Sequence, residues 1–160
     1  MDVVLAQVRT TQNSNRRSAK TGQLPTLSND VWRPPNPSVL KINIDGAFQL
    51  SSKEGSMACL CRDQNGKLID GFTRGFAASS ALQTETRAFT LTLKHMLQQG
   101  RAHDPLLIES DCQLLVNAVL DHRSMPWEVR PLLVEAIALL PCFSRLRVQH
   151  CRCEANFAAD

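Results

Sequence analysis

The chain has 160 residues, of which 43% are hydrophobic and six are cysteines, and its formal net charge is +3. This length suits one domain with a hydrophobic core and is too short for two. No apolar run approaches the roughly 18 residues of a membrane span, and residues 1–10 lack the basic start and apolar middle of a signal peptide, so the sequence predicts a soluble intracellular protein, of the nucleus or the cytoplasm.

The positive charge lies in the first 33 residues, which carry five basic and two acidic side chains. The remaining chain is neutral, so a nucleic-acid partner would be held by local Lys and Arg side chains, by the N-terminal residues, or through cations bound to clustered acids. Residues 1–30 are rich in Thr, Ser, Asn, Gln and Arg and show no sustained period. They predict a disordered or loosely ordered arm, followed by one domain over residues 31–160.

The first predicted strand covers residues 40–48, where apolar side chains alternate with Lys, Asn and Asp. Alternation at a period of two predicts one apolar face and one polar face. Asp45 ends the polar face and Gly46 ends the run. Two interpretations stay open here: an ordinary half-buried strand with a polar outer face, or a strand that carries a carboxylate into a site.

Two further strands are expected at residues 56–62 and 67–76. Residues 63–66 read Asp-Gln-Asn-Gly, and Asn-Gly tolerates the positive φ angles of a tight hairpin turn. Three consecutive strands joined by short turns predict an antiparallel meander.

A long helix is expected at residues 81–99. Ser80 and Gln83 have the spacing of a capping box, and Gly100 is a natural C-terminal stop. Glu85 falls on the apolar stripe of this helix, which places a carboxylate on the inward face. A buried carboxylate needs compensation, and either a salt bridge inside the fold or a bound cation would supply it.

Residues 105–111 form a short apolar run that closes in acids, the profile of a buried central strand whose carboxyl end opens on a site. Ser110 or Asp111 could also serve as the N-cap of the next helix, which is expected at residues 112–120. Both roles are compatible with the sequence.

The remaining pattern predicts a helix at residues 126–140, a strand at 145–153 and a loop entering a helix at 154–160. Three antiparallel strands followed by strands reached through helical crossovers give a mixed sheet with helices packed on it. The sequence therefore predicts the α/β class.

The cysteines include two C-x-C pairs, Cys59 with Cys61 and Cys151 with Cys153. Both pairs fall in segments with strand-like patterns, where they would act as small hydrophobic residues on one face. Structural zinc sites usually separate paired cysteines by two to four residues. A zinc-binding interaction module remains an alternative that zinc in the purified protein would support.

Six motifs in order carry a resemblance to a known family. Together they are similar to the RNase H-like domain, of the type 1 ribonuclease H superfamily, that is common in plant retroelement-derived reverse transcriptase-like proteins. The likeness extends over residues 31–160 and implies a ribonuclease H-like fold with a mixed five-stranded sheet. The motifs lie at residues 32–35, 41–47, 62–66, 84–88, 109–111 and 150–160.

The resemblance implies a monomeric endoribonuclease that binds nucleic acid and hydrolyses the RNA strand of RNA/DNA hybrids. It implies two Mg²⁺ ions, with Mn²⁺ as a substitute, since hard cations prefer carboxylate ligands. His150 matches by spacing a histidine that helps turnover, although an ordinary strand-end histidine is an equal interpretation. Asn156 and Gly46 match substrate-binding positions. The four catalytic, metal-binding carboxylates that the resemblance implies are Asp45, Glu85, Asp111 and Asp160.

The sequence departs from the family pattern near its end. Ala155 stands where the family usually has glycine, and Cys153 stands where a basic residue is common. The family continues into a helix after the last acid, so a domain ending at Asp160 is expected to lack most of that helix. The missing helix and the neutral charge of the domain favour an alternative function, a catalytically weak or inactive retroelement remnant that keeps the fold and some nucleic-acid binding.

Overall fold

The structure is a computed structural model that describes residues 31–156. The arm expected at residues 1–30 and the predicted acid Asp160 lie outside the described residues. Among the helices of the described part, none has the length and apolar character needed to cross a membrane.

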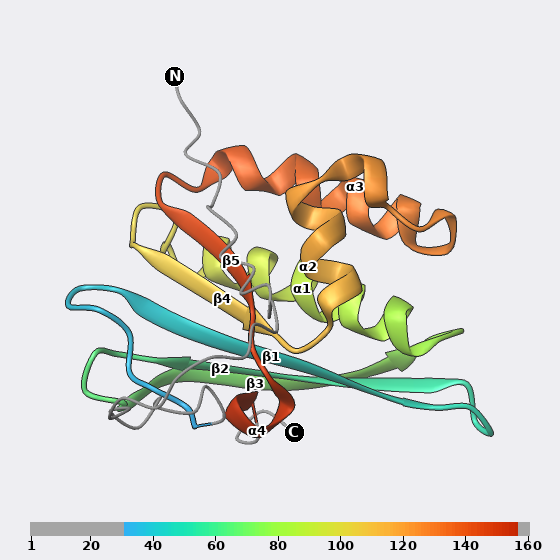
Figure 1. Ribbon diagram of the computed structural model, residues 1–160, viewed down its shortest axis with the longest axis horizontal. Coiled ribbons are helices and arrows are strands. Elements are labelled where there is room, and N and C mark those ends of the chain that lie inside the picture. The colour runs from blue at the N-terminus through green and yellow to red at the C-terminus, as the bar shows by residue number, and fades with distance from the viewer. Residues whose placement is uncertain (1–30, 157–160) are drawn as a thin grey trace, which may run out of the picture.

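A mixed five-stranded sheet forms the centre of the fold, with the strand order β3-β2-β1-β4-β5 (Figure 1). β1 pairs antiparallel with β2 and parallel with β4; β2 pairs antiparallel with β3, and β4 pairs parallel with β5. The predicted meander and crossover strands are thereby confirmed. The strands are β1 (Leu40–Gln49), β2 (Glu54–Arg62), β3 (Leu68–Ala77), β4 (Leu106–Ser110) and β5 (Leu146–His150).

Three α-helices gather over one face of the sheet, whereas the short α4 lies on the opposite side, against β1 (Figure 1). Short 3₁₀ turns precede and follow α3. The helices are α1 (Ala81–Gln98), α2 (Gln113–Leu120), α3 (Arg130–Leu139) and α4 (Cys153–Asn156), and the 3₁₀ turns are η1 (His122–Ser124), η2 (Trp127–Val129) and η3 (Leu140–Cys142).

The continuous helix expected at residues 126–140 is divided in the structure. Pro126 caps η2, and Pro131 occupies the first turn of α3. Proline has no N–H to donate and clashes with the preceding turn, so a helix accepts it only near its start. The position of Pro131 therefore explains why the α-helix begins only at Arg130.

The caps predicted for α1 are confirmed. Ser80 Oγ accepts a hydrogen bond from Gln83 N at 3.1 Å, and Gln83 Oε1 accepts one from Ser79 N at 2.7 Å. At the other end Gly100 adopts φ +71°, and its N–H donates to Leu97 O at 3.0 Å. These bonds satisfy terminal backbone groups that the helix itself leaves unpaired.

The two C-x-C pairs have different surroundings. Cys59 and Cys61 lie fully buried on β2, and burial raises the pKa of Cys59 to about 12 and that of Cys61 to about 11. Both therefore pack as neutral thiols in the core. Cys151 follows β5, and Cys153 begins α4. The prediction that the last strand extends to residue 153 is therefore wrong. β5 ends at His150 because its pairing partner β4 ends at Ser110, directly opposite.

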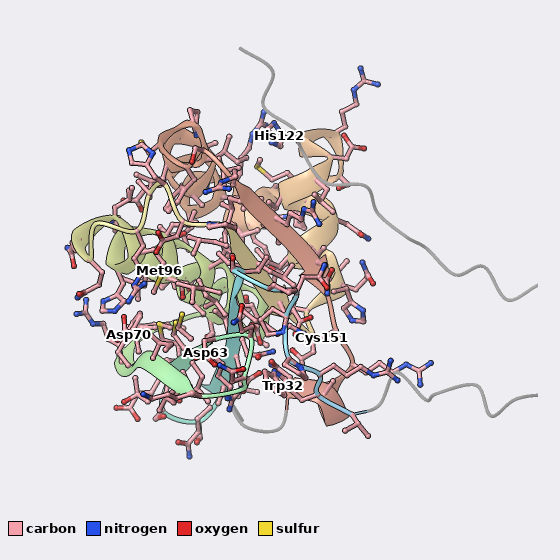
Figure 2. The ribbon with its side chains drawn as sticks, turned by 90° about the vertical axis from the view of Figure 1, so that its left-hand side faces the viewer. Trp32, Asp63, Asp70, Met96, His122 and Cys151 are labelled. Atoms are coloured by element: carbon pink, nitrogen blue, oxygen red, sulfur yellow. The ribbon has the colours of Figure 1, made fainter. Side chains whose placement is uncertain are left out.

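The polar face of β1 is buried, which corrects the expectation of a polar outer face. Lys41 is 7% exposed and Asn43 is 1% exposed. Residues 31–37, called here the N-terminal strap, cross this face: Lys41 Nζ donates to Arg33 O at 2.8 Å, and Trp32 Nε1 donates to Asn43 Oδ1 at 2.9 Å. Figure 2 shows Trp32 on one side of the sheet and Met96 among the helices on the other.

Candidate metal centre

Three carboxylates from separate elements converge at one edge of the sheet. Asp45 lies on β1, Glu85 lies near the start of α1, and Asp111 directly follows β4. One ligand oxygen from each lies within 4.8 Å of the others. The parallel pairing of β1 with β4 ends at Ile44 and Ser110, so the next residue of each strand is an acid, and both acids lie at the same carboxyl edge.

A close approach of α1 to β1 places Glu85 in this cluster. Gly46 N donates to Glu85 Oε1 at 3.2 Å. A Cβ atom on Gly46 would lie 3.0 Å from Thr84 Cγ2 and 3.1 Å from Glu85 N. Glycine at position 46 therefore lets the first turns of the helix rest directly on the strand backbone.

The surroundings of Glu85 disfavour its charged form. The residue is 8% exposed, and its pKa rises from 4.5 to about 8, first because of burial and then because of the charges on Asp45 and Asp111. Glu85 Oε2 is buried and has no hydrogen-bond partner within residues 31–156. A cation at this point would offset the repulsion and supply the missing partner, and three carboxylates are the donor set that hard divalent cations prefer.

Asp111 is not used as a helix cap. The N-cap of α2 is Cys112, and Ser110 Oγ accepts a hydrogen bond from Cys112 N at 3.1 Å. The expectation that Ser110 or Asp111 is itself the N-cap is therefore wrong, because the helix begins at Gln113. Asp111 instead contributes its carboxylate to the acidic cluster.

The other predicted site residues surround the cluster at different depths. His150 is exposed at the end of β5, and its Nε2 lies 3.1 Å from Asp111 O. Asn156 is 2% exposed and donates through Nδ2 to Ile44 O at 2.9 Å. The structure thus places His150 beside Asp111, and it places Asn156 against the residue that precedes Asp45. The roles of His150, Asn156 and Asp160 stay predictions.

A buried ion pair behind the cluster was not expected from the sequence. Lys41 Nζ lies 3.0 Å from Glu109 Oε1, and Gln149 Nε2 donates to the same carboxylate at 2.7 Å. The sequence did show one charged residue within each of two predicted strands, Lys41 and Glu109. Without the strand register, however, their pairing could not be deduced.

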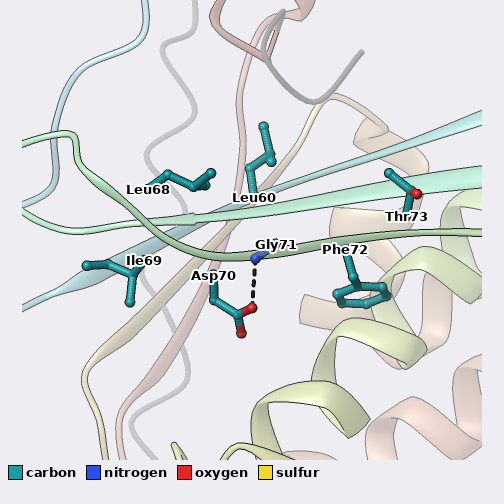
Figure 3. Close-up of a pocket in the computed structure, with 7 residues that line it drawn as sticks. All are labelled: Leu60, Leu68, Ile69, Asp70, Gly71, Phe72 and Thr73. Atoms are coloured by element: carbon teal, nitrogen blue, oxygen red, sulfur yellow. Dashed lines mark hydrogen bonds between the residues drawn. The ribbon is translucent and has the colours of Figure 1, made fainter.

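A shallow pocket of about 460 Å³ lies on the outer strands, and none of the three acids lines it (Figure 3). The acidic cluster is instead built at the carboxyl edge of β1 and β4. The residues that line the pocket are Leu60, Leu68, Ile69, Asp70, Gly71, Phe72 and Thr73.

Solved structures of similar fold include RNase H1 from the halophilic archaeon Halobacterium salinarum NRC-1. It is 17% identical with a TM-score of 0.66, and the match covers 76% of this chain and 92% of that one. The N-terminal RNase H domain of a Mycobacterium tuberculosis protein matches with 16% identity, a TM-score of 0.65, and 77% and 88% coverage. LC11-RNase H1, solved in complex with an RNA/DNA hybrid, matches with 14% identity, a TM-score of 0.64, and 76% and 91% coverage. At these identities the likeness shows the ribonuclease H fold.

Sequence comparison gives the family. A search of curated proteins finds no match. A family model described as reverse transcriptase-like matches residues 43–160, which is most of the chain and includes the whole acidic cluster. The chain therefore belongs to the reverse transcriptase-like family and has a ribonuclease H-like fold.

Proposed function

We propose that this chain is a metal-dependent endoribonuclease that hydrolyses the RNA strand of RNA/DNA hybrids. The observation that carries the proposal is the convergence of Asp45, Glu85 and Asp111 within 4.8 Å, with the pKa of Glu85 raised to about 8. A carboxyl group whose pKa is strongly raised by burial and by neighbouring charges is typical of functional sites. In this proposal residues 31–160 form one monomeric nuclease domain.

In this proposal the acids would hold two Mg²⁺ ions, with Mn²⁺ as a substitute. Asp45 would be shared between the ions, Glu85 and Asp111 would hold one, and Asp160 would hold the other. When bound, such ions activate water, neutralise the phosphate and stabilise the leaving oxygen. The chain's own contribution is to keep three acids close together despite their repulsion, through the packing of α1 on Gly46.

Two further residues have assigned roles in the proposal. His150 is exposed beside Asp111, where it would donate a proton to the departing 3′-oxygen and so help turnover. Gly46 presents backbone at the site edge, next to Glu85, where a substrate strand could approach closely. Both assignments depend on a substrate bound at the acidic cluster.

Hybrid recognition would rest on shape and on contacts to 2′-hydroxyl groups, without reading base sequence. The structure of LC11-RNase H1 with an RNA/DNA hybrid supports this choice, because that protein shares the fold. Residues 31–156 carry 14 basic and 12 acidic side chains, so only a small excess of positive charge is present to attract the substrate backbone. We therefore expect few phosphate contacts and weak binding whose dependence on salt concentration is shallow.

The test is cleavage of a hybrid labelled on its RNA strand, with Mg²⁺ or with EDTA. Matched single-stranded RNA and double-stranded DNA serve as substrate controls. Cleavage of the hybrid RNA strand that EDTA prevents is the expected result. A chain that retains hybrid in a filter-binding assay but does not cleave it in either Mg²⁺ or Mn²⁺ would contradict the proposal and favour a non-catalytic remnant.

A further inference from the structure

A directional chain of hydrogen bonds runs through the buried polar face of β1. Trp32 Nε1 donates to Asn43 Oδ1 at 2.9 Å, and Asn43 Nδ2 donates to Asn156 Oδ1 at 3.1 Å. Asn156 Nδ2 then donates to Ile44 O at 2.9 Å. The chain thus joins the N-terminal strap and α4 to the central strand.

The direction of this chain is set by chemistry at its start. An indole N–H can only donate, so Asn43 must turn its carbonyl oxygen toward Trp32. The amide nitrogen of Asn43 then points the other way, where Glu109 Oε2 accepts from it at 3.1 Å. A carboxylate accepts but does not donate when ionised, so both neighbours select the same orientation of the Asn43 amide.

The orientation of Asn43 fixes that of Asn156. Asn43 offers an N–H, so Asn156 must present its oxygen, and its own N–H₂ group is directed to Ile44 O. Asn43 is 1% exposed and Asn156 is 2% exposed. At this depth a flipped amide would leave buried polar groups unpaired, which is costly.

The series of hydrogen bonds ends at the backbone next to Asp45, one of the acids of the metal centre. The carbonyl of Ile44 belongs to the peptide that joins Ile44 to Asp45. The parallel pairing of β1 with β4 ends at Ile44 and Ser110, so Asn156 holds the strand at the point where support from β4 stops. Any freedom in this peptide would move the carboxylate of Asp45 relative to those of Glu85 and Asp111.

We propose that Asn43 and Asn156 are positioning residues of the acidic cluster, oriented by Trp32 of the N-terminal strap, and that they fix the Ile44–Asp45 peptide for cation binding. This inference rests on the proposed function, since it takes the cluster to be a metal site. It assigns to the strap a part in metal binding, although the strap contributes no ligand. Mutation of groups that orient metal ligands typically costs about 10–100-fold in metal affinity.

The experiment measures Mn²⁺ affinity of the full chain by calorimetry, thermal unfolding, and the Mg²⁺ concentration that gives half-maximal hybrid cleavage. Asn156→Ala removes the bond to Ile44 O, and Trp32→Phe removes only the N–H that orients Asn43. Thr90→Val is the matched control, because Thr90 Oγ1 makes a buried hydrogen bond to Thr86 O at 2.9 Å within α1. This variant removes a buried hydrogen bond without touching the hydrogen bonds that lead to Ile44 O.

We expect Asn156→Ala to weaken Mn²⁺ binding about tenfold and to raise the Mg²⁺ requirement in parallel. Trp32→Phe should also weaken Mn²⁺ binding and raise the Mg²⁺ requirement, but by less. If Asn156→Ala does not fold, Trp32→Phe alone tests the positioning role. Thr90→Val should lower the melting temperature and leave Mn²⁺ affinity unchanged. Folded Asn156→Ala and Trp32→Phe chains with normal Mn²⁺ affinity would overturn the positioning role, and so would an equal loss of affinity in Thr90→Val.

The two proposals fail in distinguishable ways. A wild-type chain that binds Mn²⁺ but cleaves no hybrid contradicts the proposed function alone, and the affinities of the variants still decide the positioning role. A wild-type chain that binds no Mn²⁺ overturns the positioning role together with the metal site.

Discussion

Glu85 Oε1 accepts a hydrogen bond from Gly46 N at 3.2 Å, which joins the acid of a helix to the backbone of the neighbouring strand. Gly46 directly follows Asp45, so a single contact sets the separation of two of the three acids. The contact requires that no side chain stand between the helix and the strand. Substitutions at this point should therefore affect the metal centre and the stability together.

Gly46→Ala should destabilise the fold by about 1–3 kcal/mol, the usual cost of overpacking, and should reduce hybrid cleavage. The added Cβ would meet Thr84 and Glu85 at 3.0–3.2 Å, so the start of α1 must give way by a few tenths of an ångström. Gly75→Ala is the control, because its Cβ would meet nothing closer than Gly55 O at 4.0 Å. Chemical denaturation measures both, and equal stability losses would contradict the steric argument.

Asp45→Asn should abolish Mg²⁺-dependent cleavage without unfolding the domain. The change keeps the shape of the side chain but removes the charge that the cluster needs for a cation. Asp104→Asn, which alters a surface acid paired with Arg101, should leave cleavage unchanged. The assay is cleavage of labelled hybrid, with circular dichroism to confirm folding. Cleavage that survives in the Asp45 variant would mean that the site is assigned wrongly.

The stability of the metal-free chain should fall as pH rises from about 4.5 to about 8. Within this window the folded chain keeps the Glu85 proton that the unfolded chain releases, because the pKa of Glu85 is raised from 4.5 to about 8. Glu85→Gln should remove this decline, which we expect to exceed about 1.4 kcal/mol, the equivalent of one pKa unit. Urea unfolding in EDTA at several pH values measures it.

The control for this pH series is Glu135→Gln on the surface of α3, where the carboxylate pairs with Lys94. That variant should keep the decline of the wild type. Parallel pH profiles for the wild type and Glu85→Gln would show that Glu85 does not titrate in this range.

Lys41→Met should cost about 3–5 kcal/mol of stability, because it leaves the buried carboxylate of Glu109 without its cation. The double variant Lys41→Met with Glu109→Gln should recover a large part of this loss, since no uncompensated charge remains. A double-mutant cycle by urea unfolding gives the coupling energy of the pair. Additive losses would mean that the two charges do not depend on each other.

Local patterns were sufficient to predict most of the elements. Alternation in residues 40–48 gave β1, and the spacing of Ser80, Gln83 and Gly100 gave the limits of α1 to within one residue. These signals depend on neighbours close in the chain, which the sequence displays directly. The same applies to Glu85, whose position on the apolar stripe of its helix predicted its burial.

Contacts between distant segments could not be predicted in this way. Burial of Lys41 and Asn43 depends on the N-terminal strap and on Asn156, which is 113 residues from Asn43. A single sequence does not reveal which segment covers an exposed strand face. For the same reason the sequence did not show that the amide of Asn156 bonds to Asn43 and to Ile44 O, and the substrate contact expected for Asn156 stays a prediction.

The edge strand β3 has a consequence for association between molecules. Asp70 Oδ1 accepts a hydrogen bond from Gly71 N at 2.7 Å (Figure 3), while Leu68 and Ile69 nearby are 55% and 39% exposed. An edge strand with open amides and apolar side chains is a template for strand-to-strand aggregation. By occupying one amide of this strand, Asp70 opposes the edge-to-edge pairing of β3 with a strand of a separate molecule.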